Sequence, residues 1–326
     1  MSEVMKIGFI GAGGIARAHL RRLASIPEAR VVAVCDLNEE RAREAAATFN
    51  ANVYTDYHEM VLKEKLDAVW VCIPPFAHSD EVSLCAENGI HVFIEKPIAL
   101  TIEKAREMQH AAEKHGIKTW VGYHWRQKEV VRLVKKLLIE EGGQIGLLTG
   151  YWWGGVPGAP WWRRKEMSGG QVVEQTTHIF DLARFLAGEV EKVYAEYNTL
   201  LNKDLENFNI EDVSVVTLRF RNGAVGVITS TSAAKKGGDL VGLRLVAKNL
   251  QAEIFGKNAR ILTGFKTMEV SSTEDPYLIE DHKFVKAVLE DLPCEVPISE
   301  GLKTLEVTLA AVKSAETGRP VMLPLP

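Results

Sequence analysis

Glu174, His178 and Asp181 are the first residues whose spacing indicates chemistry, because they follow one another at intervals of four and three. Such intervals put side chains on one face of a helix, and the sequence predicts a helix from about 170 to 187. A histidine titrates near neutral pH and can take a proton from an alcohol. We therefore expect His178 to be a catalytic base and Glu174, one turn earlier, to orient its imidazole or raise its pKa.

Two other interpretations of this group stay open. In the first, His178 is a satisfied, partly buried histidine without a chemical role. In the second, all three side chains bind a metal ion, but the nearby sequence lacks the additional Cys or His ligands that zinc favours. We expect no metal.

Lys96 is the second candidate catalytic residue, in the sequence Glu95-Lys96-Pro97 at the end of a predicted strand. Ligands of an open parallel sheet bind beyond the carboxyl ends of its strands, so Lys96 is expected near the nicotinamide end of a cofactor crevice. There it can hydrogen-bond a substrate hydroxyl and favour its alkoxide character. The alternative is a surface lysine paired with Glu95. Pro97 biases Lys96 towards an extended backbone, and the bond between them could be cis.

A glycine loop at 11–16 provides the candidate cofactor site. Its residues are Gly11, Ala12, Gly13, Gly14, Ile15 and Ala16, which fit G-x-G-x-x-A between the first predicted strand and the first predicted helix. Gly11 permits the tight turn, Gly13 lets a pyrophosphate approach the backbone, and Ala16 allows close packing of helix on strand. Asp36 ends the second strand, 20 residues after Ala16, where it can bind a ribose 2′-hydroxyl. The alternative is a plain turn and a solvated aspartate.

Aromatic residues crowd into the segment that precedes the histidine. They are Trp152, Trp153, Trp161 and Trp162, followed by Arg163 and Arg164. Consecutive strand residues face opposite ways, so at most one of Trp152 and Trp153 can line a given pocket. Indole rings beside guanidinium groups suit a polyhydroxylated ring, and plain packing is an equal alternative.

Alternating short apolar runs and helical patterns predict β-α-β units in residues 1–122, a doubly wound parallel sheet of Rossmann type. The expected strands are 5–10, 30–35, 68–73, 90–94 and 118–122, and the expected helices are 15–25, 39–49, 78–88 and 101–115. Residues 123–326 predict an α/β domain with a mostly antiparallel open sheet, for substrate binding and oligomerisation. There Asn222-Gly223 predicts a two-residue hairpin turn. Further helices are expected at 128–140, 277–290 and 300–317.

Composition narrows the class of partner. The 326 residues are 46% hydrophobic and 25% charged, with a net charge of −4 and no basic run, which argues against a nucleic-acid partner and for a small molecule. The four cysteines are scattered, as in a protein of a reducing compartment. No signal peptide is expected, because the short apolar run near the N-terminus is broken by glycines. No membrane span is expected either, because the uncharged stretch 142–162 is rich in glycine and suits strand and loop. We expect a cytoplasmic protein.

With these residues in place, the chain resembles the glucose-fructose oxidoreductase and inositol dehydrogenase family (Gfo/Idh/MocA) over nearly its whole length. The motifs that carry the resemblance are the glycine loop, Ile73-Pro74-Pro75 followed by His78, 89–97 ending in Glu95-Lys96-Pro97, Trp162-Arg163, and Ser168-Gly169-Gly170 leading to His178 and Asp181. The resemblance implies a Rossmann domain, an open antiparallel sheet that often makes dimer or tetramer contacts, and NAD(P)-linked chemistry at a sugar or polyol carbon.

The resemblance also implies roles for single residues. Lys96 and His178 match the catalytic pair. Cofactor contacts are implied at Ile73, Pro74, His78, Glu95 and Lys96, and substrate contacts at Lys96, Tyr123, His124, Trp162, Arg163, Glu174 and His178. Departures lie on the substrate side: Glu174 stands where Asp is common, Thr176 where Gly is usual, and 123–126 differ from the common aromatic-Asn-Arg-Arg pattern. These departures leave the substrate open.

The resulting hypothesis is an NAD-dependent dehydrogenase of a sugar, cyclitol or glycoside alcohol, active as a homodimer or homotetramer. NAD is preferred to NADP because Asp36 would repel a 2′-phosphate. One alternative is a glycosidase that retains NAD for transient oxidation. Another is a non-catalytic NAD-binding regulator, which would have no use for a proton-handling pair such as Lys96 and His178.

Overall fold

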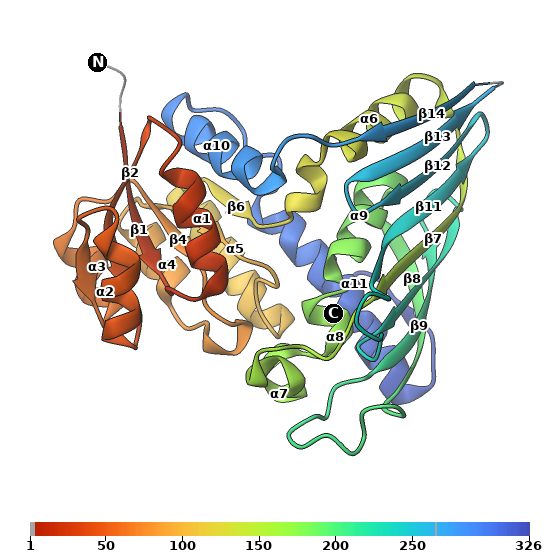
Figure 1. Cartoon of the computed structure of the whole chain (residues 1–326), viewed down its shortest axis with the longest axis horizontal. Helices are drawn as coiled ribbons and strands as arrows, with labels where there is room; N and C mark the ends of the chain where they lie inside the picture. Colours follow the sequence, from red (N-terminus) through yellow and green to blue (C-terminus); the bar gives the residue numbers. More distant parts are fainter. Residues whose placement is uncertain (1–3, 265) are drawn as a thin grey trace. The chain divides into compact units, whose positions relative to one another are not determined.

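Two sheets organise the chain in the computed structural model, which describes residues 4–264 and 266–326 (Figure 1). They belong to two compact units. Of the described residues, the first unit holds those up to His124 together with Asp275–Leu302, and the second holds those from Trp125 to Glu274 together with Lys303–Pro326. The parallel first sheet and the mostly antiparallel second sheet confirm the predicted fold class.

The first sheet has six strands in the order β3-β2-β1-β4-β5-β6, all parallel to their neighbours. Its strands are β1 (Met5–Ile10), β2 (Ala29–Cys35), β3 (Asn52–Tyr54), β4 (Ala68–Val71), β5 (His91–Ile94) and β6 (Thr119–Val121). The helices of this unit are α1 (Gly14–Leu23), α2 (Glu39–Ala47), α3 (Tyr57–Lys63), η1 (Pro75–Ala77), α4 (Glu81–Glu87), α5 (Ile102–His115) and α10 (Pro276–Leu289). The strand order reverses at β1 and β4, the place where doubly wound folds bind their ligands.

Side-chain caps explain where several of these helices begin. Asn38 accepts the amide of Arg41 at the start of α2, and Thr101 accepts the amide of Lys104 at the start of α5. Gly116 ends α5 with φ +67°, a left-handed conformation that favours glycine. The sequence analysis does not predict β3 or α3. Three residues are too few to establish the period of a strand, and the seven residues of α3 make fewer than two complete turns of helix.

Helix α10 packs on the first unit although it follows the second sheet in the sequence. Phe284 lies edge-on to Trp70, with ring centroids 5.3 Å apart, and also contacts Phe93. Trp70 and Phe93 are themselves stacked at 5.4 Å. A sequence-based division at residue 122 does not include this segment in the first domain, because the aromatic contacts that bring it there span about 200 positions.

The second sheet has nine strands in the order β14-β13-β12-β11-β7-β10-β9-β8-β15. Its strands are β7 (Ile145–Trp153), β8 (Val190–Asn198), β9 (Val213–Phe220), β10 (Val225–Thr231), β11 (Leu240–Ala247), β12 (Leu250–Phe255), β13 (Asn258–Thr263), β14 (Lys266–Ser271) and β15 (Val321–Met322). All neighbours are antiparallel except β7 and β10. The predicted two-residue hairpin turn is wrong. Phe220 pairs with Ala224, so the loop is Arg221-Asn222-Gly223, with Gly223 at φ +90°.

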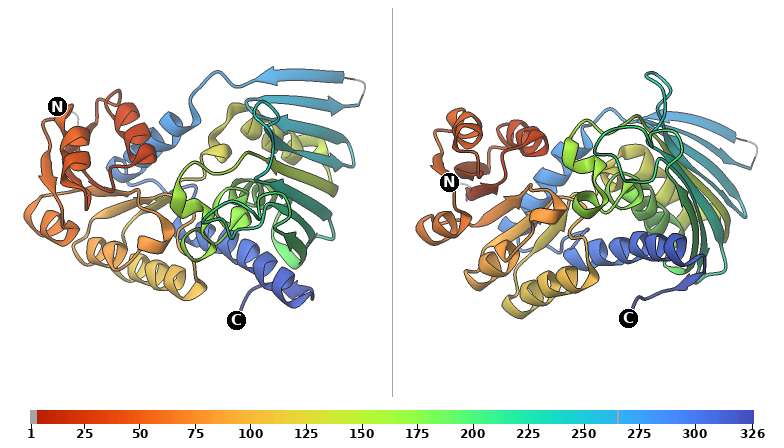
Figure 2. Two further views of the ribbon diagram at one scale, coloured as in Figure 1. Left: turned by 60° about the horizontal axis from the view of Figure 1, so that its bottom comes forward. Right: turned by 90° about the horizontal axis from the view of Figure 1, so that it is seen from below.

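Helices lie on one face of this second sheet, and its opposite face carries none among residues 4–264 and 266–326 (Figure 2). The remaining helices and turns of the chain are η2 (His124–Gln127), α6 (Glu129–Leu137), η3 (Leu138–Gly142), η4 (Pro160–Arg163), α7 (Lys165–Ser168), α8 (Gln171–Glu174), α9 (Thr177–Ala187) and α11 (Ile298–Thr317), of which α6, α8 and α9 contact strands of this sheet. Helix α11 begins in the first unit and continues in the second. No described helix is both long and apolar enough to cross a membrane.

Candidate active site

The glycine loop joins β1 to α1 and shows the shape expected of a phosphate cradle. Gly11 has φ +93°, and a Cβ there would lie 2.5 Å from the carbonyl oxygen of Cys72. In contrast, a Cβ on Gly13 or Gly14 would meet no protein atom within 4 Å. No side chain in the described chain caps the start of α1, and its first turn holds no acidic residue. These amides and the positive end of the helix fit a pyrophosphate.

Asp36 follows β2 and lies against this loop. Its Oδ2 accepts the amide of Ala12 at 2.8 Å, and its Oδ1 accepts the amide of Asn38 at 2.9 Å. Arg41 Nη1 lies 3.6 Å from the same Oδ1 and its side chain is about half exposed. The carboxylate is therefore held in one orientation beside the cofactor loop, with one cation within reach.

Ile73 and Pro74 follow β4, and His78 follows the turn η1. His78 Nδ1 lies 2.6 Å from Glu81 Oε1, and Glu81 Oε2 accepts the amide of Ser79. Burial raises the pKa of Glu81, but His78 outweighs burial and the net pKa is lowered. The imidazole of His78 is thus anchored to α4 by a buried carboxylate that the sequence analysis did not identify.

Glu95 and Lys96 follow β5, and the Lys96–Pro97 peptide bond is cis. The Glu95 carboxylate is buried, and its Oε2 accepts the Lys96 amide at 3.1 Å. Tyr123 and His124 follow β6 and are also buried. His124 stacks on Tyr277 of α10, with centroids 3.8 Å apart. Asp36, Ile73, Lys96 and Tyr123 all stand one or two residues after the carboxyl ends of strands in one sheet.

The predicted single helix over 170–187 is wrong, because the chain forms α8 and α9 with Gln175 and Thr176 between them. The amide of Thr176 bonds the carbonyl of Gln171, five residues back, and this wider turn interrupts the helical ladder. Glu174 therefore ends α8, whereas His178 lies in the first turn of α9. Both side chains are buried.

Asp181 forms its hydrogen bonds with Arg126 and Thr304. Its two oxygens accept a bidentate pair of hydrogen bonds from Arg126, at 2.8 and 2.6 Å, and Thr304 also donates to it. This buried ion pair disfavours the metal interpretation of Glu174, His178 and Asp181, because a guanidinium already occupies the carboxylate.

Trp152 and Trp153 are consecutive residues of β7, and their side chains lie on opposite faces of the sheet. Trp152 stacks on His178, whereas Trp153 is 42% exposed and donates to Thr229 on β10. Trp162 lies in η4, stacked with Trp161. Arg163 donates to the carbonyl of Pro157 at 2.7 Å and so closes its own loop.

Glu211 is a residue that the sequence analysis missed. It is buried and accepts the amide of Val172 in α8 at 2.7 Å. A Cβ on Gly170, which has φ +103°, would lie 2.4 Å from Glu211 Oε2, so glycine is required there. Burial raises the pKa of Glu211 to about 7. The Gly169-Gly170 pair was the available signal, since close approach of a side chain is a common reason for glycine.

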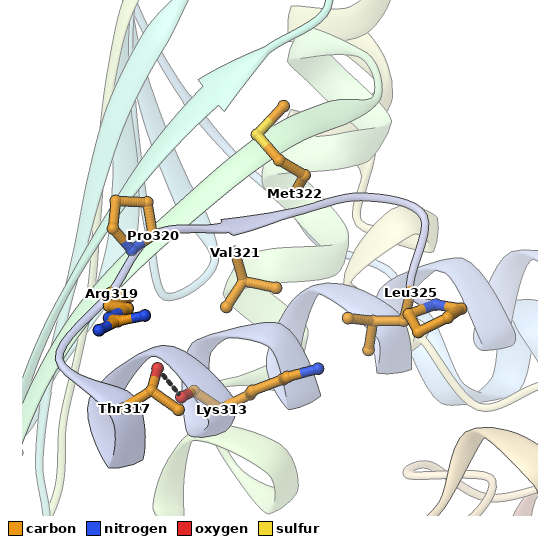
Figure 3. A pocket seen from close by; sticks show the side chains of 8 residues that line it. Lys313, Thr317, Arg319, Pro320, Val321, Met322 and Leu325 are labelled. Carbon is orange, nitrogen blue, oxygen red and sulfur yellow. Dashed lines mark hydrogen bonds between the residues drawn. The ribbon is translucent and has the colours of Figure 1, made fainter.

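Other features of the chain lie apart from these residues. A groove of about 570 Å³ opens between the end of α11 and the C-terminal strand, lined by Lys313, Arg319 and Met322 among others, and it contains none of the predicted site residues (Figure 3). Cys35, Cys72 and Cys85 are buried and Cys294 is partly so. Burial raises the pKa of both Cys35 and Cys85 to about 12, so these thiols stay protonated at neutral pH.

Comparisons with known proteins agree with the two-domain fold. Residues 5–123 match an oxidoreductase family with an NAD-binding Rossmann fold, and residues 132–262 match the GFO/IDH/MocA C-terminal domain. A myo-inositol 2-dehydrogenase from Thermotoga maritima is 32% identical, with 98% of each chain covered. A scyllo-inositol 2-dehydrogenase (NAD(+)) from Bacillus subtilis is 26% identical over 99% of this chain and 97% of its own. The WlbA dehydrogenase from Bordetella pertussis, solved with NADH and UDP-GlcNAcA, has a TM-score of 0.87 at 26% identity, covering 99% of this chain and all of its own.

Proposed function

Because the chain belongs to the Gfo/Idh/MocA oxidoreductase family, we propose that it is an NAD-dependent dehydrogenase acting on a secondary alcohol of a cyclitol or sugar. The observation that carries this proposal is the convergence of three features at the carboxyl edge of one parallel sheet. They are the open glycine loop, the anchored Asp36 and the Glu95-Lys96 segment. The cyclitol dehydrogenases among its relatives make inositols the first substrates to test.

The residues of the first unit would hold the cofactor. The amides at the start of α1 suit the pyrophosphate, and the Asp36 carboxylate suits the adenosine ribose hydroxyls. When bound, NAD supplies the acceptor for the hydride that leaves the substrate carbon. All remaining tasks fall to side chains of this protein: binding the alcohol, removing its proton and stabilising the charge that develops on its oxygen.

We assign those tasks to three residues. Lys96 donates a hydrogen bond to the substrate hydroxyl and favours negative charge on its oxygen. His178 accepts the hydroxyl proton, and Glu174 orients the imidazole. The support comes from residue type for all three: an amine that can donate hydrogen bonds, an imidazole that can accept a proton, and a carboxylate four residues before that imidazole. The stacked Trp152 ring limits how far the His178 imidazole can turn.

A spectrophotometric panel tests the function. Purified protein with NAD is offered myo-inositol, scyllo-inositol, glucose, xylose and nitrophenyl glycosides, and NADH absorbance and nitrophenol release are followed together. The proposal expects NADH to accumulate with at least one cyclitol or sugar. Nitrophenol release without net NADH would instead support a glycosidase, and binding of NADH without turnover of any compound would support a regulator.

We further propose that the protein is a cytoplasmic homo-oligomer that covers the open face of its second sheet. Large apolar side chains are 40% exposed or more on that face, among them Leu147, Val215 and Val225. Exposed apolar surface of this kind is costly to leave in water. Light scattering is expected to give a dimer or tetramer, and the Val215→Glu variant to dissociate it. A mass of about 36 kDa at micromolar concentration would refute this assembly.

A further inference from the structure

A buried group of ionisable side chains lies around Glu95 in the first unit. His19 comes from α1, Glu95 follows β5, and Glu280 and Asp281 come from α10. His19, Glu280 and Asp281 are fully buried, and Glu95 is 6% exposed. Ionisable groups are rarely buried this deeply unless they are paired, so the hydrogen bonds of this group indicate its role.

These connections form one chain of hydrogen bonds. Asp281 Oδ1 lies 2.7 Å from His19 Nδ1, and His19 Nε2 lies 3.0 Å from Glu95 Oε1. The other oxygen of Glu95 accepts the Lys96 amide at 3.1 Å. Trp70 also donates to Asp281 Oδ1. The chain thus runs from α10, through the helix that begins at the glycine loop, to the backbone of the proposed catalytic lysine.

The imidazole of His19 is a cation in this setting. Each of its ring nitrogens faces a carboxylate oxygen, so each must carry a proton to donate. Burial by itself lowers the pKa of His19, but the Asp281 and Glu95 carboxylates outweigh it and raise the pKa to about 10. His19 therefore stays charged throughout the neutral range.

A metal ion does not explain this group. His19, Glu95 and Glu280 have potential ligand atoms within 4.8 Å of one another. However, both nitrogens of His19 are committed to carboxylates, so neither has a lone pair for a metal. Burial also holds the pKa of Glu280 well above its ordinary range, which disfavours the charged carboxylate that a metal ion would need.

The surroundings hold the His19 imidazole and the Glu95 carboxylate in place. Phe93 and Tyr277 lie edge-on to the imidazole, with ring centroids 5.0 and 5.8 Å away. A Cβ on Gly122 would lie only 2.8 Å from Glu95 Oε1. Neither group can turn away without disturbing packed neighbours, and such confinement is what a supporting residue of a catalytic site needs.

We propose that His19 and Asp281 are positioning residues for the reaction, which hold Glu95 and through it the backbone of Lys96 in register with the cofactor helix α1. This inference rests on the proposed role of Lys96. It assigns to α10, far along the chain, a part in aligning the lysine with the nicotinamide. Neither residue needs to touch substrate or cofactor.

His19→Gln is the first test variant, because glutamine cannot bridge the two carboxylates with a positive charge. His91→Gln is its matched control. His91 stands at the other end of β5, where its Nδ1 accepts the amide of Lys118 at 3.0 Å. Asp281→Asn, which keeps the side-chain size, serves as a second test variant if His19→Gln does not fold. Lys96→Ala is measured alongside.

Two readouts are expected to move together. In His19→Gln or Asp281→Asn, exchange of the Lys96 amide, measured by NMR, rises about tenfold or more because its acceptor is no longer fixed. At the same time kcat falls about 10- to 100-fold, the usual effect of a small misplacement, while KM for the polyol and Kd for NADH stay within about threefold. His91→Gln changes neither amide exchange nor kcat, even at an equal loss of Tm.

Unchanged exchange of the Lys96 amide in a folded His19→Gln or Asp281→Asn protein overturns the inference, whatever the substrate is. An equal loss of kcat in His91→Gln does so too, since it would reveal a general effect of stability. The proposed function fails separately, if no alcohol is oxidised by the wild type or if Lys96→Ala keeps its turnover.

Discussion

Trp152 lies stacked on His178, with ring centroids 5.8 Å apart and ring planes 19° apart. Its neighbour Trp153 points to the other face of the sheet and bonds Thr229. Two adjacent tryptophans thus serve different surfaces, and only one of them can influence the proposed base.

This separation makes the two tryptophans a matched pair. Trp152→Leu is expected to lower kcat about tenfold, because an unsupported imidazole samples unproductive orientations. Trp153→Leu is expected to keep kcat within about twofold, since its ring lies on the opposite face of β7. Steady-state kinetics with saturating NAD measures both. Equal losses in the two variants would contradict a specific role for the stacked ring.

Substitution of each proposed catalytic residue is expected to have a different effect on the kinetics. His178→Ala is expected to lower kcat about 10²- to 10⁴-fold, the usual effect of losing a positioned base, with NADH binding unchanged. Lys96→Ala is expected to be at least as damaging, because it removes the charge that favours the alkoxide. Glu174→Gln is expected to cost less and to shift the acidic limb of the kcat profile. Near-normal turnover in both Ala variants would exclude this assignment.

Asp36 and Arg41 predict how cofactor choice can be changed. Wild-type protein is expected to favour NAD over NADP by about 1–3 kcal/mol in kcat/KM, from repulsion between the carboxylate and a 2′-phosphate. In Asp36→Ala, the freed Arg41 guanidinium is expected to improve use of NADP, and the added Arg41→Ala change to abolish that gain. Kinetics with both cofactors decides. Equal use of NADP by the wild type would contradict the role of Asp36.

Glu211 predicts a pH dependence of stability. Its pKa is about 7 in the folded protein against about 4.5 when exposed, so the folded state binds the extra proton between these values. Stability is therefore expected to fall as pH rises from about 4.5 to 7, by about 3 kcal/mol at roughly 1.4 kcal/mol per unit. Glu211→Gln removes this titration. Urea unfolding at pH 5 and pH 8 should show a smaller difference for the variant, and an equal difference would disprove the assignment.

Local patterns were enough to predict much of the first unit. The glycine loop, Asp36 and Lys96 each lie at a junction of strand and helix, and residues close in sequence determine such junctions through their hydrophobic period and backbone freedom. The roles of Lys96, Glu174 and His178 stay predictions. The helical spacing of residues 174, 178 and 181 wrongly predicted that they share one helix face. A single wide turn at Thr176 ends the first helix and changes the direction of every later side chain.

By itself, the sequence determined the β-α-β architecture, and it predicted the cofactor loop and the two candidate proton-handling residues. Only the tertiary structure decided three contacts. Asp281 forms a hydrogen bond with His19 across 262 positions, Arg126 forms an ion pair with Asp181, and the Glu211 carboxylate lies against Gly170. The physical reason is that a short-range sequence pattern reflects the local backbone preferences and the hydrophobic period of neighbouring residues. A buried charge is stabilised by whichever partner the packed fold brings to it, and that partner leaves no periodic signal in the sequence.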